Sequence, residues 1–123
     1  MRKAMMNVMV AGGLALLWPA MAWAGPEGEQ VTAGQANFQR EGAVTTIEAA
    51  NNTIINYQQF NIGAGEMVRF IQPSANARVL NRVIGPGATQ IDGTLLSNGH
   101  VYIANKYGVF FGNNAIVNVG RLT

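Results

Sequence analysis

Short apolar runs separated by glycine and asparagine constrain the fold of this chain more than any other feature. The pattern is clearest in NKYGVFFGNNAIVNVG, residues 105–120, where pairs and triplets of apolar residues alternate with Asn and Gly. Such runs are typical of β-strands and turns, because Gly and Asn tolerate positive φ and Pro presets φ. Helical periodicity is hard to find after residue 25. The sequence therefore predicts an all-β fold.

The runs also give the positions of the strands and of the core. Side chains alternate between the two faces of a strand, so Val68 and Phe70 face one side and Arg69 the other. We predict strands near Gln30–Val31, Gln35–Phe38, Thr45–Ile47, Thr53–Tyr57, Glu66–Ile71, Arg78–Ile84, Gln90–Leu95, His100–Ala104, Val109–Phe111 and Ile116–Val119. We expect a core of Val68, Phe70, Val79, Val83, Ile91, Leu95, Val101, Ile103, Val109, Phe111, Val117 and Val119.

The spacing of the strands favours a β-solenoid over a sandwich or a barrel. Apolar centres recur about every eight to ten residues, at Ile91, Val101, Val109 and Val117. Charge is sparse, the strands are short, and asparagine recurs at turns, where stacked side chains on successive coils can bond one another in ladders. A solenoid needs covered ends. We expect the less regular residues 25–62 to cap the N-terminal end, and the fold to be C-terminally incomplete at Thr123.

The N-terminal segment has the features of a secretory signal peptide. Positive charge at the start is followed by an apolar run over residues 8–18 and by the small residues Ala22 and Ala24 around Trp23. We place cleavage before Gly25, so that residues 1–24 form the signal peptide and address the chain to the Sec translocon. An uncleaved membrane anchor is the alternative, but the apolar run is short for a span of roughly 20 residues.

Removal of this segment leaves the exported part, residues 25–123, without net charge. The chain has 8 Lys and Arg against 6 Asp and Glu, and two of the basic residues, Arg2 and Lys3, lie in the signal peptide. The sequence therefore shows no basic patch that would indicate binding to nucleic acid or anionic lipid. There is no cysteine, so a disulfide framework is excluded.

Residues that carry chemistry are scarce in the exported part. His100 is the only histidine, Asp92 the only aspartate and Lys106 the only lysine. Histidine-pair metal sites are excluded, and neither a Ser-His-Asp triad nor a carboxylate pair is supported. We therefore predict a protein that is not an enzyme and has no metal or cofactor. Aromatic residues suit a binding stripe or, more often, core and turn packing, and here they are Tyr57, Phe60, Tyr102, Tyr107, Phe110 and Phe111.

Several ordered motifs resemble a known family. FNIGAGEMVRFIQPSANARVLNRVIG, residues 60–85, and QIDGTLLSNGHVYIANKYGVFFGNNAIVNVGRLT, residues 90–123, resemble the N-terminal secretion domain of filamentous haemagglutinin-like proteins, the exported members of two-partner secretion systems. GEQVTAGQANF and NTIINYQQFNIG, residues 28–38 and 52–63, resemble the opening segments of that domain. The resemblance covers nearly all of the exported part.

The resemblance implies both fold and function. The fold would be a right-handed parallel β-helix with an N-terminal cap. The domain would reach the periplasm, be recognised largely unfolded by the periplasmic domains of an outer-membrane β-barrel transporter, and seed β-helix folding of the passenger outside the cell. The product would be secreted or on the cell surface. Pairing of a strand of the chain with a receptor sheet edge is our hypothesis for the recognition step.

The resemblance also implies which residues carry secretion. Asn105 and Gly108 match the first and last positions of the family's Asn-Pro-Asn-Gly motif, whereas Lys106 and Tyr107 depart from it. The other matching residues are Asn81, Arg82, Val83 and Gly85 of an Asn-Arg-Val-x-Gly block, with Gln72, Pro73 and Ser74 before it.

Three alternatives stay open at this point. The chain would fit a fragment of a β-helical enzyme acting on polysaccharide, a surface or matrix subunit that assembles through its open coil ends, or the remnant of a gene without a working product.

Overall fold

The computed structural model describes residues 25–123, which fold entirely into strands and turns, with no transmembrane helix among them. The predicted signal peptide, with Ala22 and Ala24, lies outside the described residues. The strands are β1 (Pro26–Glu27), β2 (Gln30–Ala33), β3 (Ala36–Glu41), β4 (Val44–Ala49), β5 (Thr53–Tyr57), β6 (Gln59–Phe60), β7 (Met67–Ile71), β8 (Arg78–Val83), β9 (Thr89–Ile91), β10 (Thr94–Ser97), β11 (His100–Asn105), β12 (Val109–Phe111), β13 (Ile116–Asn118) and β14 (Arg121–Leu122).

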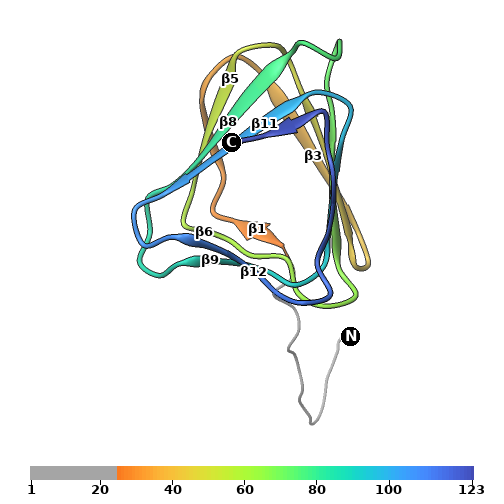
Figure 1. Ribbon diagram of the computed structural model, residues 1–123. Coiled ribbons are helices and arrows are strands. Elements are labelled where there is room, and N and C mark those ends of the chain that lie inside the picture. Colours follow the sequence, from red (N-terminus) through yellow and green to blue (C-terminus); the bar gives the residue numbers. More distant parts are fainter. Residues whose placement is uncertain (1–24) are drawn as a thin grey trace, which may run out of the picture.

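The strands wind into a three-sided parallel β-solenoid. One side is the sheet β13-β10-β7-β4-β3, the second is β14-β11-β8-β5-β2, and the third contains β12 and β9. From β4 onward, strands of successive coils pair in parallel, as Val44 does with Met67 and Met67 with Thr94. Figure 1 looks along the coils, with β5, β8 and β11 together on one side and β6, β9 and β12 on another. The predicted solenoid is therefore confirmed.

The first three strands form a cap over the first coil. β3 pairs antiparallel with β4, β2 with β5 and β1 with β6, so each side of the first coil receives one antiparallel strand. Phe38 of β3 packs against the core, and its ring meets Tyr57 edge-on at a centroid distance of 6.3 Å. The expected N-terminal cap is confirmed for β1–β3, because these strands cover the edges and the apolar end of the first coil. The prediction is wrong for the rest of residues 25–62, since β4 and β5 already pair in parallel with the next coil and belong to the solenoid.

The core fills the space between the three sides. Seven of the predicted core residues are buried: Val68, Phe70, Val79, Val83, Ile91, Leu95 and Val101. Ile103, Val109 and Val119 are partly buried against them. The prediction is wrong for Phe111 and Val117, which are 47% and 39% exposed. They pair in register with buried Ile91 and Leu95 and thus face inward, but no described coil lies beyond them.

One predicted strand is divided by a corner. The sequence predicts a continuous strand over Gln90–Leu95, whereas the chain turns between β9 and β10 at Asp92 and Gly93. The amides of both residues donate to the carbonyl of Ile62 on the previous coil. A Cβ at Gly93 would lie 2.3 Å from the carbonyl oxygen of Gly63, so only glycine allows this close approach.

Asparagine has a different role from the one predicted. The ladder hypothesis has asparagine side chains bonding one another, but within residues 25–123 their hydrogen bonds go to other groups. The Oδ1 atoms of Asn51, Asn61 and Asn98 accept from backbone amides of a neighbouring coil, at 2.9, 2.8 and 2.7 Å. Each of these asparagines satisfies a backbone donor at a corner, where the strand ladder is interrupted.

Candidate recognition surface

Asn105 and Gly108 fix the corner between β11 and β12. The amide of Gly108 donates to the carbonyl of Asn105, and the amide of Tyr107 donates to its side-chain Oδ1, both at 2.9 Å. The second bond closes an Asx turn. Gly108 has a φ of 105°, which favours glycine at this position. The two residues that match the secretion motif therefore determine the turn.

The same corner is joined to the coil before it. The Nδ2 group of Asn105 donates to the carbonyl of Gly87 at 3.1 Å and to Oγ1 of buried Thr89 at 3.0 Å. The amide of Thr89 in turn donates to the carbonyl of Gly108 at 3.0 Å. Asn105 is thus occupied by bonds within the domain, and an amide is required there whatever binds outside.

The two positions that depart from the motif point into solvent. Tyr107 is 51% exposed, Lys106 is exposed, and the Lys106 ammonium lies 5.2 Å from the Tyr107 ring centroid. The ring of Phe110, 53% exposed, lies against Gly108, where an added Cβ would meet it at 2.9 Å. We call Lys106, Tyr107 and Phe110 the corner surface; composition alone did not distinguish these aromatic residues from buried Tyr57 and Phe60.

Asn81 and Gln72 are buried in polar connections between coils. Asn81 is 0% exposed; its Oδ1 accepts from the Tyr57 hydroxyl at 2.6 Å, and its Nδ2 donates to the carbonyl of Tyr102 at 3.1 Å. Gln72 donates through Nε2 to the carbonyls of Ala77 and His100, and its Oε1 accepts from Ser97. Both side chains therefore satisfy buried polar groups of neighbouring coils.

The remaining motif residues divide between packing and surface. A Cβ at Gly85 would lie 2.2 Å from the carbonyl oxygen of Gln58, so a side chain is excluded there. Arg82 is exposed and donates from Nε to Asn56, and Pro73 is exposed. Gly85 follows β8 as the Asn105 turn follows β11, with Val83 paired to Asn105. These two blocks thus share a corner on successive coils, whereas Gln72 and Pro73 lie beyond the opposite end of β8 and join neither.

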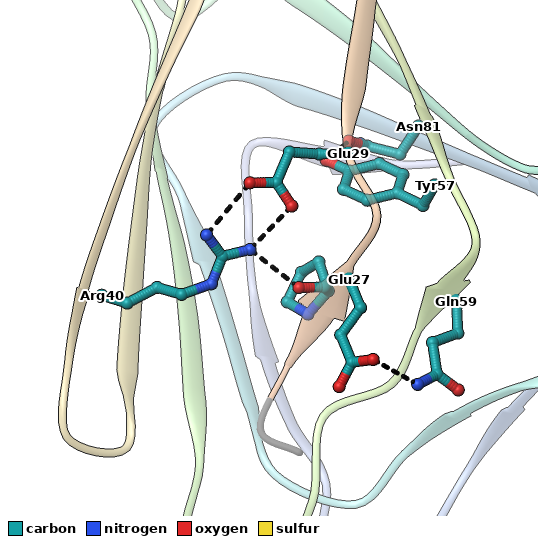
Figure 2. Close-up of polar contacts among 7 residues, drawn as sticks. Glu27, Glu29, Arg40, Tyr57, Gln59 and Asn81 are labelled. Carbon is teal, nitrogen blue, oxygen red and sulfur yellow. Dashed lines mark hydrogen bonds and ion pairs between the residues drawn. The ribbon is translucent and has the colours of Figure 1, made fainter. Parts of the chain in front are cut away.

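A polar cluster that the sequence did not predict fastens the cap (Figure 2). Arg40 forms a bidentate ion pair with Glu29, at 3.0 and 2.9 Å, and also donates to the carbonyl of Pro26 at 2.8 Å. Glu27 accepts from the Gln59 amide at 2.8 Å. The cluster joins residues of β1, β3 and β6 that are far apart in sequence. No local motif in the sequence gives this pairing.

Two ionisable groups near this cluster are shifted by their surroundings. Burial raises the pKa of the Tyr57 hydroxyl, the Glu29 carboxylate raises it further and Arg40 opposes both, so the phenol stays neutral and donates to Asn81. Burial also acts to raise the pKa of Glu29. The Arg40 hydrogen bonds and charge, with a backbone hydrogen bond, outweigh it, and the pKa of Glu29 is lowered.

In the described part of the chain, no three His, Asp or Glu side chains gather as metal ligands would. Asp92 accepts from Gln90 at the corner after β9, apart from the glutamates of the cap. The corner after β11 combines exposed side chains with a turn held by internal hydrogen bonds, and the residues that match the family motif lie in it.

Comparison with known proteins agrees with this architecture. The family model described as "TPS secretion domain" matches residues 22–123. Two curated relatives are heme/hemopexin-binding proteins of Haemophilus influenzae, 42% identical over 98 residues and 35% over 99, each match covering 79% of this chain. The crystal structure of the HMW1 secretion domain from Haemophilus influenzae has a TM-score of 0.76 and 41% identity, with 77% of this chain and 26% of that chain covered.

The matched region is a small share of the relatives. It spans 11% of the length of each heme/hemopexin-binding protein, so the matches concern the secretion module. Proteins with this module are secreted by Gram-negative bacteria, and their secretion domains are recognised by cognate outer-membrane transporters. The predicted family is confirmed: this chain belongs to the TPS secretion domains of two-partner secretion exoproteins.

Proposed function

We propose that the chain is a non-enzymatic export module that crosses the periplasm and is recognised there by the periplasmic domains of its outer-membrane transporter. In this proposal residues 1–24 direct it to the Sec translocon and are removed before Gly25. The observation that carries the recognition step is the corner surface. Its turn is held by Asn105 and Gly108, while Lys106 and Tyr107 are presented to solvent.

This division assigns different tasks to the motif residues. Asn105, Gly108, Asn81, Gly85 and Gln72 make contacts within the domain. Their substitution would change the fold, and export would then fall through loss of structure. Direct contact with the transporter belongs to exposed side chains, which at this corner are those of Lys106, Tyr107 and Phe110.

Strand pairing is the second element of the proposed recognition. The outer strands β12, β13 and β14 each have a partner on one side only among the described strands. Such edges present free backbone groups to which a receptor strand can add. A chain in which the Asn105 turn has formed but other strands are still unpaired would offer more of them. Val68 and Val101 lie in β7 and β11, which are paired on both sides in the complete fold and would be open to a receptor strand only in such a partly folded chain. Proline at Val68 or Val101 removes a strand donor, and we expect weaker receptor binding; unchanged binding would exclude strand pairing.

The test is export with and without the transporter. The tagged full chain is expressed in a Gram-negative host, and medium and periplasm are compared. We expect the chain in the medium only when the transporter is present. Retention in the periplasm in both hosts would contradict the proposal, as would release into the medium in both.

Two variants separate the turn from the surface. Lys106→Pro with Tyr107→Asn restores the family motif, and the Tyr107 amide bond to Asn105 is retained by any residue other than proline. We expect the turn to persist, so that a change in export would reflect contact with the transporter rather than loss of structure. Phe110→Ser removes exposed apolar surface, and Ile71→Ser, 43% exposed on another side, is the matched control. Equal export of both serine variants would contradict a role for the corner surface.

A further inference from the structure

The outer face of the sheet β14-β11-β8-β5-β2 carries an unusual pattern of side chains. In β8, Arg78 and Arg82 are exposed and Leu80 is half-buried, whereas the residues between them are buried. The outward side of this strand therefore reads basic, apolar, basic. Successive outward positions are roughly 6.6 Å apart along an extended chain.

The neighbouring strands extend each of these positions into a row. Arg78 pairs with His100 and His100 with Arg121, which gives a row of cationic and imidazole groups. Leu80 lies between Ile54 and Tyr102, which gives an apolar row. A groove of about 300 Å³ follows this apolar row and is lined by Asn52, Thr53, Ile54, Arg78, Leu80 and Tyr102.

The charges of this face are not balanced by acids. The five strands of the sheet contain Arg78, Arg82 and Arg121 and no Asp or Glu. Arg78 and Arg82 donate to the neutral amides of Asn52 and Asn56, each at 2.9 Å. Among residues 25–123 the ion pair lies elsewhere, in the cap. The net charge of zero over residues 25–123 therefore conceals a local excess of arginine on this face.

We propose that this face binds an extended acidic peptide segment in which two carboxylates flank an apolar side chain, in the order acid-x-apolar-x-acid. Such a segment repeats the two-residue period of β8, so its apolar side chain enters the groove beside Leu80 while its carboxylates reach Arg78 and Arg82. A nucleic acid or sulfated glycan fits less well, because its negative groups would also lie over the apolar row. There they would lose hydrating water without gaining a hydrogen-bond partner or a counter-charge.

The experiment measures binding of a labelled peptide with Glu-Ser-Leu-Ser-Glu at its centre. The chain is exported, purified from the host and checked by circular dichroism, and binding is followed by fluorescence anisotropy. We expect Arg78→Gln and Arg82→Gln each to weaken binding about threefold and the double variant about tenfold, as for exposed charge pairs. Arg69→Gln is the matched control, since Arg69 is also exposed with a neutral partner, Thr46, but on another sheet.

The other outcomes would overturn the proposal. An equal loss with Arg69→Gln would mean attraction to charge in general. Unchanged binding of a peptide with Ser in place of Leu would show that the groove does not contribute to binding. Unchanged binding of a peptide with Gln in place of both Glu residues would show that the arginines do not contribute. Both tests use the unaltered chain. Binding of a sulfated oligosaccharide or of anionic phosphatidylglycerol vesicles, but not of the peptide, would assign the face to another class of ligand.

Discussion

The hydroxyl of Tyr57 is the smallest change that tests the polar connection through the core. Tyr57→Phe removes one oxygen and leaves the ring in place, packed edge-on against Phe60 at a centroid distance of 5.1 Å. The hydroxyl donates to Oδ1 of Asn81, which is 0% exposed and sits on the next coil. Without it, Oδ1 of Asn81 is left as a buried acceptor that has lost this donor.

The expected effect follows from that unpaired acceptor. Leaving a buried polar group unsatisfied costs about 1–3 kcal/mol, and each kcal/mol lowers the Tm of a domain of this size by about 4–8 °C. Far-UV circular dichroism in urea measures the free energy of unfolding. Tryptophan fluorescence would not report on the domain, because both tryptophans, Trp18 and Trp23, precede residue 25. Tyr107→Phe is the control, because that side chain is 51% exposed and its change should be close to neutral.

A double-mutant cycle assigns the effect to the pair. Asn81→Ala alone removes the bonds to both Tyr57 and Tyr102. If the hydroxyl acts through Asn81, the combined variant loses less free energy of unfolding than the sum of the losses in the two single variants. The difference should be about 1 kcal/mol. A strictly additive cycle, or a Tyr57→Phe variant as stable as the parent, would refute the reasoning.

Three further outcomes are expected. Gly85→Ala should destabilise the domain several times more than Gly87→Ala, because an alanine Cβ at residue 85 would lie 2.2 Å from the Gln58 carbonyl oxygen. At residue 87 there is open space, and alanine would meet only a φ of 97°, which is strained for a residue with a Cβ; equal urea midpoints would contradict this. Glu29 has a lowered pKa, so its contribution of about 0.2–1 kcal/mol is present above its unfolded pKa and lost as pH falls through the folded one; urea midpoints of the parent should therefore fall more on acidification than those of Glu29→Gln, and parallel curves would contradict this. Gln72→Met should cost about 1–3 kcal/mol by removing bonds to three neighbours, and unchanged hydrogen-exchange protection of the His100 strand would contradict it.

The sequence predicted most of the solenoid because strands and turns are local. The alternation of side chains along each strand predicts that Val68, Val79 and Val101 face inward, and all three are buried. The strands β1, β6 and β14 have 2 residues each, too few to show a period. The corner at Gly93 was missed for a related reason, since the backbone of another coil makes glycine necessary there.

The site was predicted less completely, because its residues depend on register between coils. The sequence alone does not give the pairing of Arg78 with His100 and of His100 with Arg121. A sum of charges over the exported part hides the basic face for the same reason. The family motif located the Asn105 turn, but only the structure separates its inward bonds from the exposed Lys106 and Tyr107.

This separation changes how loss of export is to be interpreted. A motif residue such as Asn105 is needed by the turn and by Thr89, so its substitution impairs folding whether or not a transporter touches it. Lys106 and Tyr107 differ from the family motif while the turn that displays them keeps its hydrogen bonds. Under the proposed function, specificity for one transporter would vary at these exposed positions while the fold stays constant. Contact is best argued from variants that alter export and leave the free energy of unfolding unchanged.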